Sequence, residues 1–202
     1  MRRLIHIPLI HSAIDLGSFA ESVKAHYGKL AGDHGWEQRE HMVATVWNHI
    51  ERSIQMLQLD WAKTRLYQDG LPVCGFEEQI VREVAEAGSR NHLLVVELLD
   101  RGATLEGTED PRLLMAEYEM QKRKVESPST PPDGKAPDRQ AESLLEARDA
   151  YIATRIDATL NPGETGLLFL GTYHRLDALQ STDIQVRPLA ELSNEAVGRP
   201  RA

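Results

Sequence analysis

Four short apolar runs in this chain are each followed by a residue that can titrate or bind a metal ion: His11, Asp69, Glu109 and His174. Two imidazoles and a carboxylate suffice for a divalent metal site with open positions for water. A metal held there would make its bound water acidic enough to act as a nucleophile for hydrolysis. Without a metal, a histidine could act as the general base on water while Glu109 orients it. These residue types therefore favour hydrolytic chemistry, with or without a metal.

Short strands must position these side chains. The clearest run is residues 166–170, which is followed by Gly171 and is too short for a helix, so it is typical of a buried parallel strand. Further strands are predicted over residues 4–10, 65–67 and 103–105. In open α/β sheets, ligands bind outside the carboxyl ends of the strands. If the strands are parallel, all four polar residues lie along one edge of the sheet.

The segments between the strands show helical spacing of their apolar residues. This spacing predicts helices over residues 18–30, 36–59, 76–87, 89–99, 111–125 and 139–160. A short helix after Gly171 and a last strand over residues 184–189 complete the predicted order. Strands separated by helices indicate an α/β fold with a mostly parallel central sheet of about five strands and helices on both faces.

The predicted organisation is a single α/β domain over residues 1–192. Residues 126–138 are rich in proline and contain no large apolar side chain, so they predict a flexible insertion. This insertion is either a lid over the sheet edge or a passive surface loop. Residues 193–202 are expected to be a disordered tail.

Arg148 is the most unusual residue of the helix predicted over residues 139–160. It lies on the apolar face of that helix, one turn from Leu145 and from Ile152. A guanidinium in such a place is costly unless a carboxylate or a ligand meets it, and Asp149 is a local candidate. Arg148 therefore forms a structural salt bridge, binds an anionic group, or orients a catalytic carboxylate.

Bulk composition excludes several classes of function. The net charge is −8, and the densest basic cluster, residues 122–124, suits a helix end, so nucleic-acid binding is not expected. No stretch approaches the roughly 20 apolar residues needed to span a membrane. The single cysteine, Cys74, excludes an internal disulfide and predicts a cytoplasmic protein, and Cys74 itself is either an apolar filler or a thiol of lowered pKa. The phosphate-binding glycine motifs and the GxSxG elbow are absent, which argues against dinucleotide, NTP and serine-hydrolase chemistry.

Two features together suggest a family. One is Arg148-Asp149 followed by Ile152-Ala153, a strand and then Gly171-x-x-His174; the other is an early strand ending in His11 and a later one ending in Glu109. This pattern resembles the superfamily of erythromycin esterases, ChaN-like haem-binding proteins, TraB/PrgY proteins and Tiki-type metalloproteases. The sequence departs from that pattern at its early motif, which reads Ile-His-Ser rather than G-x-x-H. The stretch at residues 67–72 has no assignable counterpart.

The resemblance implies a hydrolase in which His11, Glu109 and His174 surround the attacking water and Arg148 holds a substrate anion or the catalytic carboxylate. The same three residues are the candidate ligands for Mn²⁺, Co²⁺ or Zn²⁺. Side chains expected to complete the substrate site are Asp15, Gln68, Asp69 and Tyr173. The substrate is expected to be a small molecule or a peptide, and homo-oligomerisation is left open.

Two alternatives remain at this point. In the first, the crevice binds a small ligand or haem without catalysis, with His174 or Tyr173 as an axial ligand. In the second, the chain is a signalling or scaffold module that uses its exposed helices to bind partners.

Overall fold

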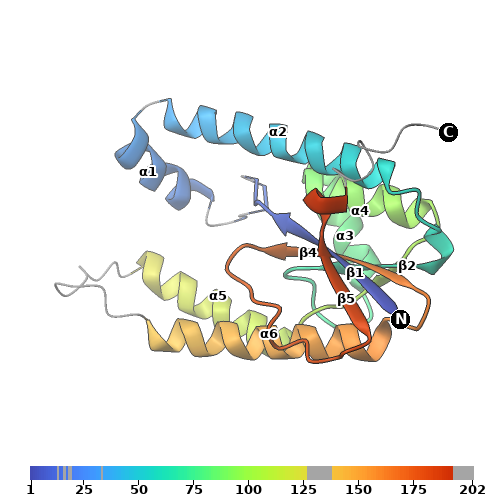
Figure 1. Cartoon of the computed structure of the whole chain (residues 1–202). Helices are drawn as coiled ribbons and strands as arrows, with labels where there is room; N and C mark the ends of the chain where they lie inside the picture. Colours follow the sequence, from blue (N-terminus) through green and yellow to red (C-terminus); the bar gives the residue numbers. More distant parts are fainter. Residues whose placement is uncertain (13, 16, 18–19, 33, 127–137, 193–202) are drawn as a thin grey trace.

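The structure is a computed structural model that describes residues 1–12, 14–15, 17, 20–32, 34–126 and 138–192. A five-stranded parallel sheet forms its centre, in the order β3-β2-β4-β1-β5 (Figure 1). The strands are β1 (Arg2–Leu9), β2 (Thr64–Gln68), β3 (Thr104–Glu106), β4 (Thr165–Gly171) and β5 (Ile184–Pro188). The predicted parallel sheet of about five strands is therefore confirmed.

Six α-helices of the described residues are named along the chain. They are α1 (Ala20–Ala31), α2 (Gly35–Met56), α3 (Glu77–Glu86), α4 (Arg90–Asp100), α5 (Pro111–Glu126) and α6 (Arg139–Thr159). None of the helices in the described ranges is long and apolar enough to cross a membrane.

Helices cover both faces of the sheet because successive side chains of each strand point to opposite faces. On one face, Ile5 and Ile7 of β1 pack in a cluster with apolar residues of α2, α3 and α4, among them Trp47. On the other face, Leu4 of β1 and Leu168 of β4 pack with apolar residues of α6. The predicted placement of helices on both faces is confirmed.

Two helical hairpins extend beyond the edge of the sheet at which β1 and β4 end. The first consists of α1 packed on α2, and the second of α5 packed on α6. Figure 1 shows the first hairpin above this edge and the second below it. The carboxyl ends of the central strands therefore lie between two helical walls.

Residues 172–183 differ from the prediction of a short helix, which is wrong. This segment consists of turns. The amide of Arg175 donates to Asp149 on α6, and Leu176 and Leu179 pack against the apolar cluster beneath α6. These contacts hold the segment against α6.

Three predictions fall wholly or partly outside the described residues: the start of the helix predicted over residues 18–30, most of the proline-rich insertion, and the tail over residues 193–202. The described ends of the insertion are Glu126, the last residue of α5, and Asp138, the N-cap of α6. The Asp138 carboxylate accepts from the Ala141 amide and lies 3.0 Å from Lys124. This ion pair joins the end of α5 to the start of α6.

Candidate active site at the carboxyl edge of the sheet

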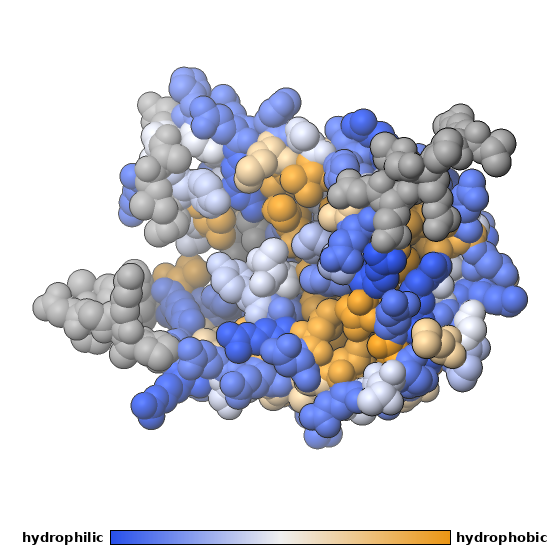
Figure 2. Space-filling view, viewed as in Figure 1, coloured by the Kyte–Doolittle hydropathy of each residue, from blue (hydrophilic) through white to orange (hydrophobic). Residues whose placement is uncertain are grey.

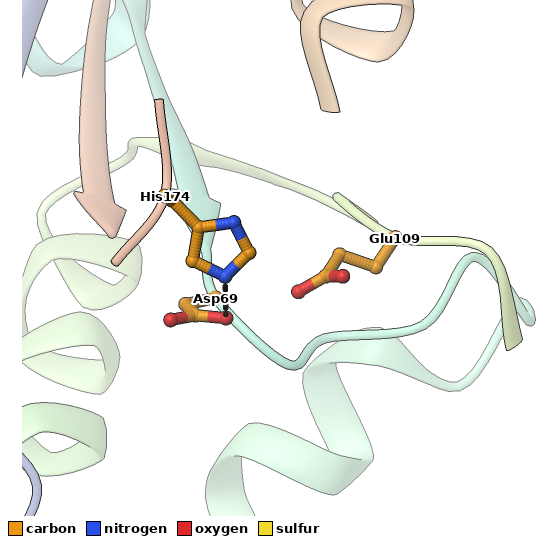
Figure 3. A group of neighbouring side chains, drawn as sticks. All are labelled: Asp69, Glu109 and His174. Atoms are coloured by element: carbon orange, nitrogen blue, oxygen red, sulfur yellow. Dashed lines mark ion pairs between the residues drawn. The ribbon is translucent and has the colours of Figure 1, made fainter. Parts of the chain in front are cut away.

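Polar residues that follow three neighbouring strands meet at one point. Asp69 comes directly after β2, Glu109 follows β3, and His174 follows β4. One ligand atom from each of them lies within 4.8 Å of the other two. Figure 3 shows the carboxylates of Asp69 and Glu109 turned toward the same region as the ring of His174. The structure thus brings together two of the three predicted central residues, with Asp69 as the third member.

Arg148 on α6 joins these carboxylates. Its Nε and Nη2 atoms donate to the two oxygens of Glu109 at 2.5 and 2.7 Å. Nη2 also donates to Asp69 Oδ1 at 3.0 Å, and Nη1 donates to Glu117 on α5. The Arg148 side chain is only 6% exposed. The cost of placing this cation on an apolar helix face is therefore offset by three carboxylates. They come from other elements, and neighbouring Asp149 is not one of them.

His174 is oriented by Asp149, the neighbour of Arg148 on α6. The His174 Nδ1 atom lies 2.6 Å from Asp149 Oδ1, and the second carboxylate oxygen of Asp149 accepts from the backbone amide of Arg175 at 3.0 Å. Because an ionised carboxylate only accepts hydrogen bonds, this pairing assigns a proton to Nδ1. The other ring nitrogen, Nε2, lies 3.4 Å from Asp69 Oδ1.

Two backbone amides donate further hydrogen bonds to the carboxylates of Asp69 and Glu109. The Gly171 amide donates to Asp69 Oδ2 at 2.9 Å, and the Gly70 amide donates to Glu109 Oε1 at 2.7 Å. A Cβ atom at position 171 would lie 2.7 Å from Asp69 Oδ2, closer than packing allows. Gly171 is therefore needed for the close approach of its backbone to Asp69.

The charges of the cluster shift its pKa values in different directions. Burial alone would raise the pKa of Asp69, but the adjacent His174 ring and the Arg148 charge hold it well below its ordinary value. Burial raises the pKa of Glu109 although Arg148 opposes the shift. Burial alone would lower the pKa of His174, but Asp69 and then Asp149 raise it above its ordinary value of 6.5. Separated pKa values of this kind are typical of sites that transfer protons.

A cleft of about 520 Å³ opens above the cluster. Its floor contains Asp69, Gly171 and His174, and residues of both helical hairpins line its walls. Figure 2 shows a notch in the surface between the two hairpins, on the left of the molecule. This volume lies in the range typical of small-molecule sites.

Two other predicted site residues line the same cleft without joining the cluster. The chain leaves the sheet at Leu9, so the side chain of His11 is exposed two residues beyond the strand. Among the described residues, the group that could hold a metal does not include His11. Tyr173 is 85% exposed and lies on the rim. The predicted ligand set of His11, Glu109 and His174 is therefore not assembled in this structure.

The remaining two predicted residues have other surroundings. Asp15 accepts from the amide and hydroxyl of Ser12, both at 2.7 Å, and from Ser89 at the start of α4 at 2.5 Å. These bonds tie the segment after β1 to α4. Gln68 is 1% exposed, and its amide nitrogen donates to the Asp69 carbonyl at 3.3 Å. Neither Asp15 nor Gln68 is among the residues lining the cleft.

Sequence reasoning missed two contributors, Glu117 and the role of Asp149. The available signal for Asp149 was its position beside Arg148 on the helix face that is buried in the structure. Glu117 lies on α5 at 34% side-chain exposure, and its sequence neighbours do not distinguish it from a surface acid. Both contacts depend on how helices from the second hairpin meet the sheet edge.

Comparison of this chain with the models of known protein families, with curated proteins and with solved structures found no match. The class of this protein is therefore defined here by its fold and its candidate site. It is an α/β protein with a parallel sheet that carries an arginine–carboxylate–histidine cluster at the carboxyl edge of its central strands.

Proposed function

We propose that the protein is a hydrolase of carboxylic esters or related acyl compounds that uses His174 as its general base. The observation that carries this proposal is His174 at the floor of the cleft, with Nδ1 2.6 Å from the Asp149 carboxylate. In the neutral ring this bond keeps the proton on Nδ1, so Nε2 is the atom that can accept one. Placement at the carboxyl edge of a parallel sheet supports it as well. The resemblance to the erythromycin esterase superfamily implies the same type of reaction.

In the proposed reaction, a water molecule in the cleft attacks the carbonyl carbon of the substrate. His174 Nε2 takes one proton from this water as the new C–O bond forms. The bond to the leaving group then breaks, and His174 returns the proton to the leaving oxygen. Asp149 holds the ring and stabilises the imidazolium while the proton is on it. The products are an acid and an alcohol.

Arg148 acts as a positioning residue in this proposal. All three of its guanidinium nitrogens are already bonded to carboxylates, so it has little capacity to bind a substrate anion. It fixes Asp69 and Glu109 instead, and Asp69 in turn faces His174 Nε2. Of the interpretations drawn from the sequence, these contacts favour a salt bridge that orients the carboxylates.

The pH dependence of hydrolysis tests the role of His174. His174 must be neutral to accept a proton, and its pKa is raised by Asp69 and Asp149. We expect kcat/KM for 4-nitrophenyl acetate to increase with pH through an inflection above 6.5, and to fall about tenfold per pH unit below that inflection. A pH profile measured with the background rate subtracted checks this. A flat profile between pH 5 and 8 would contradict a histidine base.

A second candidate uses the same residues with a divalent metal, which would supply a more acidic water. The observation in its favour is the group of Asp69, Glu109 and His174, whose oxygen and nitrogen donors suit Mn²⁺, Co²⁺ or Zn²⁺. The contacts of Arg148 weigh against it, because this cation already neutralises both carboxylates. The haem alternative has less support, since both ring nitrogens of His174 face carboxylates.

Metal removal separates these two candidates. If Arg148 is the resident counter-ion, untagged protein treated with EDTA should keep its esterase rate and bind less than about 0.1 equivalent of Zn²⁺ or Mn²⁺ in equilibrium dialysis. Binding near one equivalent that is lost in Asp69→Asn, together with a rate restored only by the metal, would establish the second candidate instead. Asp157→Asn, an exposed acid of α6 outside the cleft, is the matched control.

A further inference from the structure

Arg39 on α2 lines the cleft on the wall formed by the first hairpin. Its guanidinium lies 5.0 Å from the ring centroid of Trp36 and 5.5 Å from that of Tyr27. Its Nη2 atom donates to the His11 carbonyl at 2.7 Å, and Nη1 donates to Glu40 at 2.8 Å. The Arg39 side chain is 10% exposed. Two rings and a backbone carbonyl therefore hold this cation in one orientation beside the cleft.

Arg39 differs from Arg148 in how far its charge is neutralised. Arg148 is bonded to three carboxylates, whereas the described residues give Arg39 a single one, Glu40. A guanidinium has five N–H donors, and the contacts found in the described part of the chain use two of those of Arg39. Stacking on aromatic rings fixes a guanidinium without removing its charge. Arg39 is thus the arginine of this cleft that is suited to accept an anionic oxygen group.

The opposite wall of the cleft is formed by the second hairpin and combines the ion pair of Glu117 and Arg148 with an aliphatic patch. Leu114 of α5 and Leu145 of α6 form this patch, and His174 lies on the floor between the two walls. A ligand that fills the cleft therefore meets a cation at one wall, aliphatic side chains at the other and the proposed base below.

We infer that the substrate carries an anionic oxygen group, a carboxylate or a phosphate, which binds Arg39, and an apolar part that packs between the hairpins. This inference rests on the proposed function, because it assigns the substrate class of that site. The ester or acyl bond to be cleaved lies over His174, and Arg39 determines specificity without touching the reacting atoms.

A pair of esters tests the inference. Wild-type protein should hydrolyse mono-4-nitrophenyl glutarate at least about tenfold better than neutral 4-nitrophenyl acetate in kcat/KM, since charge-assisted hydrogen bonds discriminate by that order. In Arg39→Gln the ratio of the two kcat/KM values should fall toward one. Arg39→Lys keeps the charge but not the bidentate geometry, and should retain part of the preference. Arg52→Gln, an exposed arginine of the same helix, should leave the ratio unchanged.

A binding measurement keeps this inference separate from the proposed function. Calorimetric titration with 4-phenylbutyrate and with 3-phenylpropyl phosphate distinguishes a carboxylate from a phosphate ligand. If neither ester is hydrolysed but one of these anions binds wild type about tenfold more tightly than Arg39→Gln, the anion site stands and the hydrolase proposal fails. If both esters are hydrolysed with no preference, or both anions bind the two proteins equally, the anion site is overturned and the hydrolase proposal is untouched.

Discussion

His174→Gln should lower kcat/KM for ester hydrolysis by about 100- to 10,000-fold, the range that general-base catalysis contributes. Asp149→Asn should cause a loss of similar order, for a specific reason. The amide of the substituted side chain can donate to Nδ1, and the ring then carries its proton on Nε2, where it can no longer accept one from water. Steady-state kinetics of both variants against the wild type would measure these losses.

Matched controls separate catalysis from folding in this experiment. His49→Gln removes an exposed histidine of α2, and Asp157→Asn removes an acid on the same helix as Asp149. Both should retain the wild-type rate to within about twofold. The general-base assignment would fail if His174→Gln, with an unchanged melting temperature, hydrolysed the ester as fast as His49→Gln does.

Arg148→Met should reduce the free energy of unfolding by about 3–5 kcal/mol, because it leaves buried carboxylates without their counter-ion. Glu109 is fully buried, so water cannot replace the lost charge there, and the Asp69 side chain is only 8% exposed, so water replaces it in part. A loss of this size is a large part of the roughly 5–15 kcal/mol that stabilises a typical domain. Urea denaturation at pH 7 would measure it.

The pH dependence of the loss in unfolding free energy shows whether unpaired carboxylates cause it. Burial already raises the pKa of Glu109 above that of the unfolded chain, and loss of Arg148 removes the charge that opposes this shift, so the variant takes up a proton on folding and gains stability as the pH falls. The lowered pKa of Asp69 does not affect this comparison, because its contribution to stability is lost only as the pH falls below 3.8. The difference between the two proteins should therefore shrink from pH 7 to pH 4.

Two further variants keep the Arg148 prediction testable. Glu109→Gln combined with Arg148→Met removes one unpaired charge and should recover part of the lost stability, even if the single variant does not fold. Arg155→Met removes a 26% exposed arginine of the same helix, which should cost less than about 1 kcal/mol. Equal losses for Arg148→Met and Arg155→Met would show that the carboxylate cluster does not depend on its arginine.

The sheet could be predicted because a short apolar run marks its strands in the sequence. Four large apolar residues between two glycines, as at residues 167–170 of β4, are typical of a buried strand, and the predicted strand ends indicated that Glu109 and His174 lie at one edge of the sheet. His11 could not be placed in this way, since the path of the chain after β1 is set by the contacts of Asp15 with Ser12 and Ser89. Glu109 and His174 lie three residues beyond their strands and join the cluster, whereas His11 lies two residues beyond β1 and does not. Long-range contacts, and not the distance from the strand end, therefore decide where such a residue lies.

The partners of charged residues were harder to predict than the residues themselves. Arg148 stood out because a cation interrupts an apolar helix face, but its three acids come from the end of β2, from the segment after β3 and from α5. Asp149 was adjacent in sequence and was the obvious partner, yet it binds His174, which is 25 residues away. The second oxygen of Asp149 binds the amide of Arg175, which ties the start of the turns over residues 172–183 to α6.

The order of the strands has a consequence for synthesis of the chain. In β3-β2-β4-β1-β5, β1 pairs with β4 and β5, while β2 pairs with β3 and β4. A nascent polypeptide that has not yet emerged past Thr165 therefore holds two separate pieces with no hydrogen-bonded ladder between them. The late central strand must insert between its neighbours, a non-local step that favours slow maturation on the ribosome. The proposed active site takes residues that follow β2, β3 and β4, so it cannot assemble before β4 and His174 have been translated.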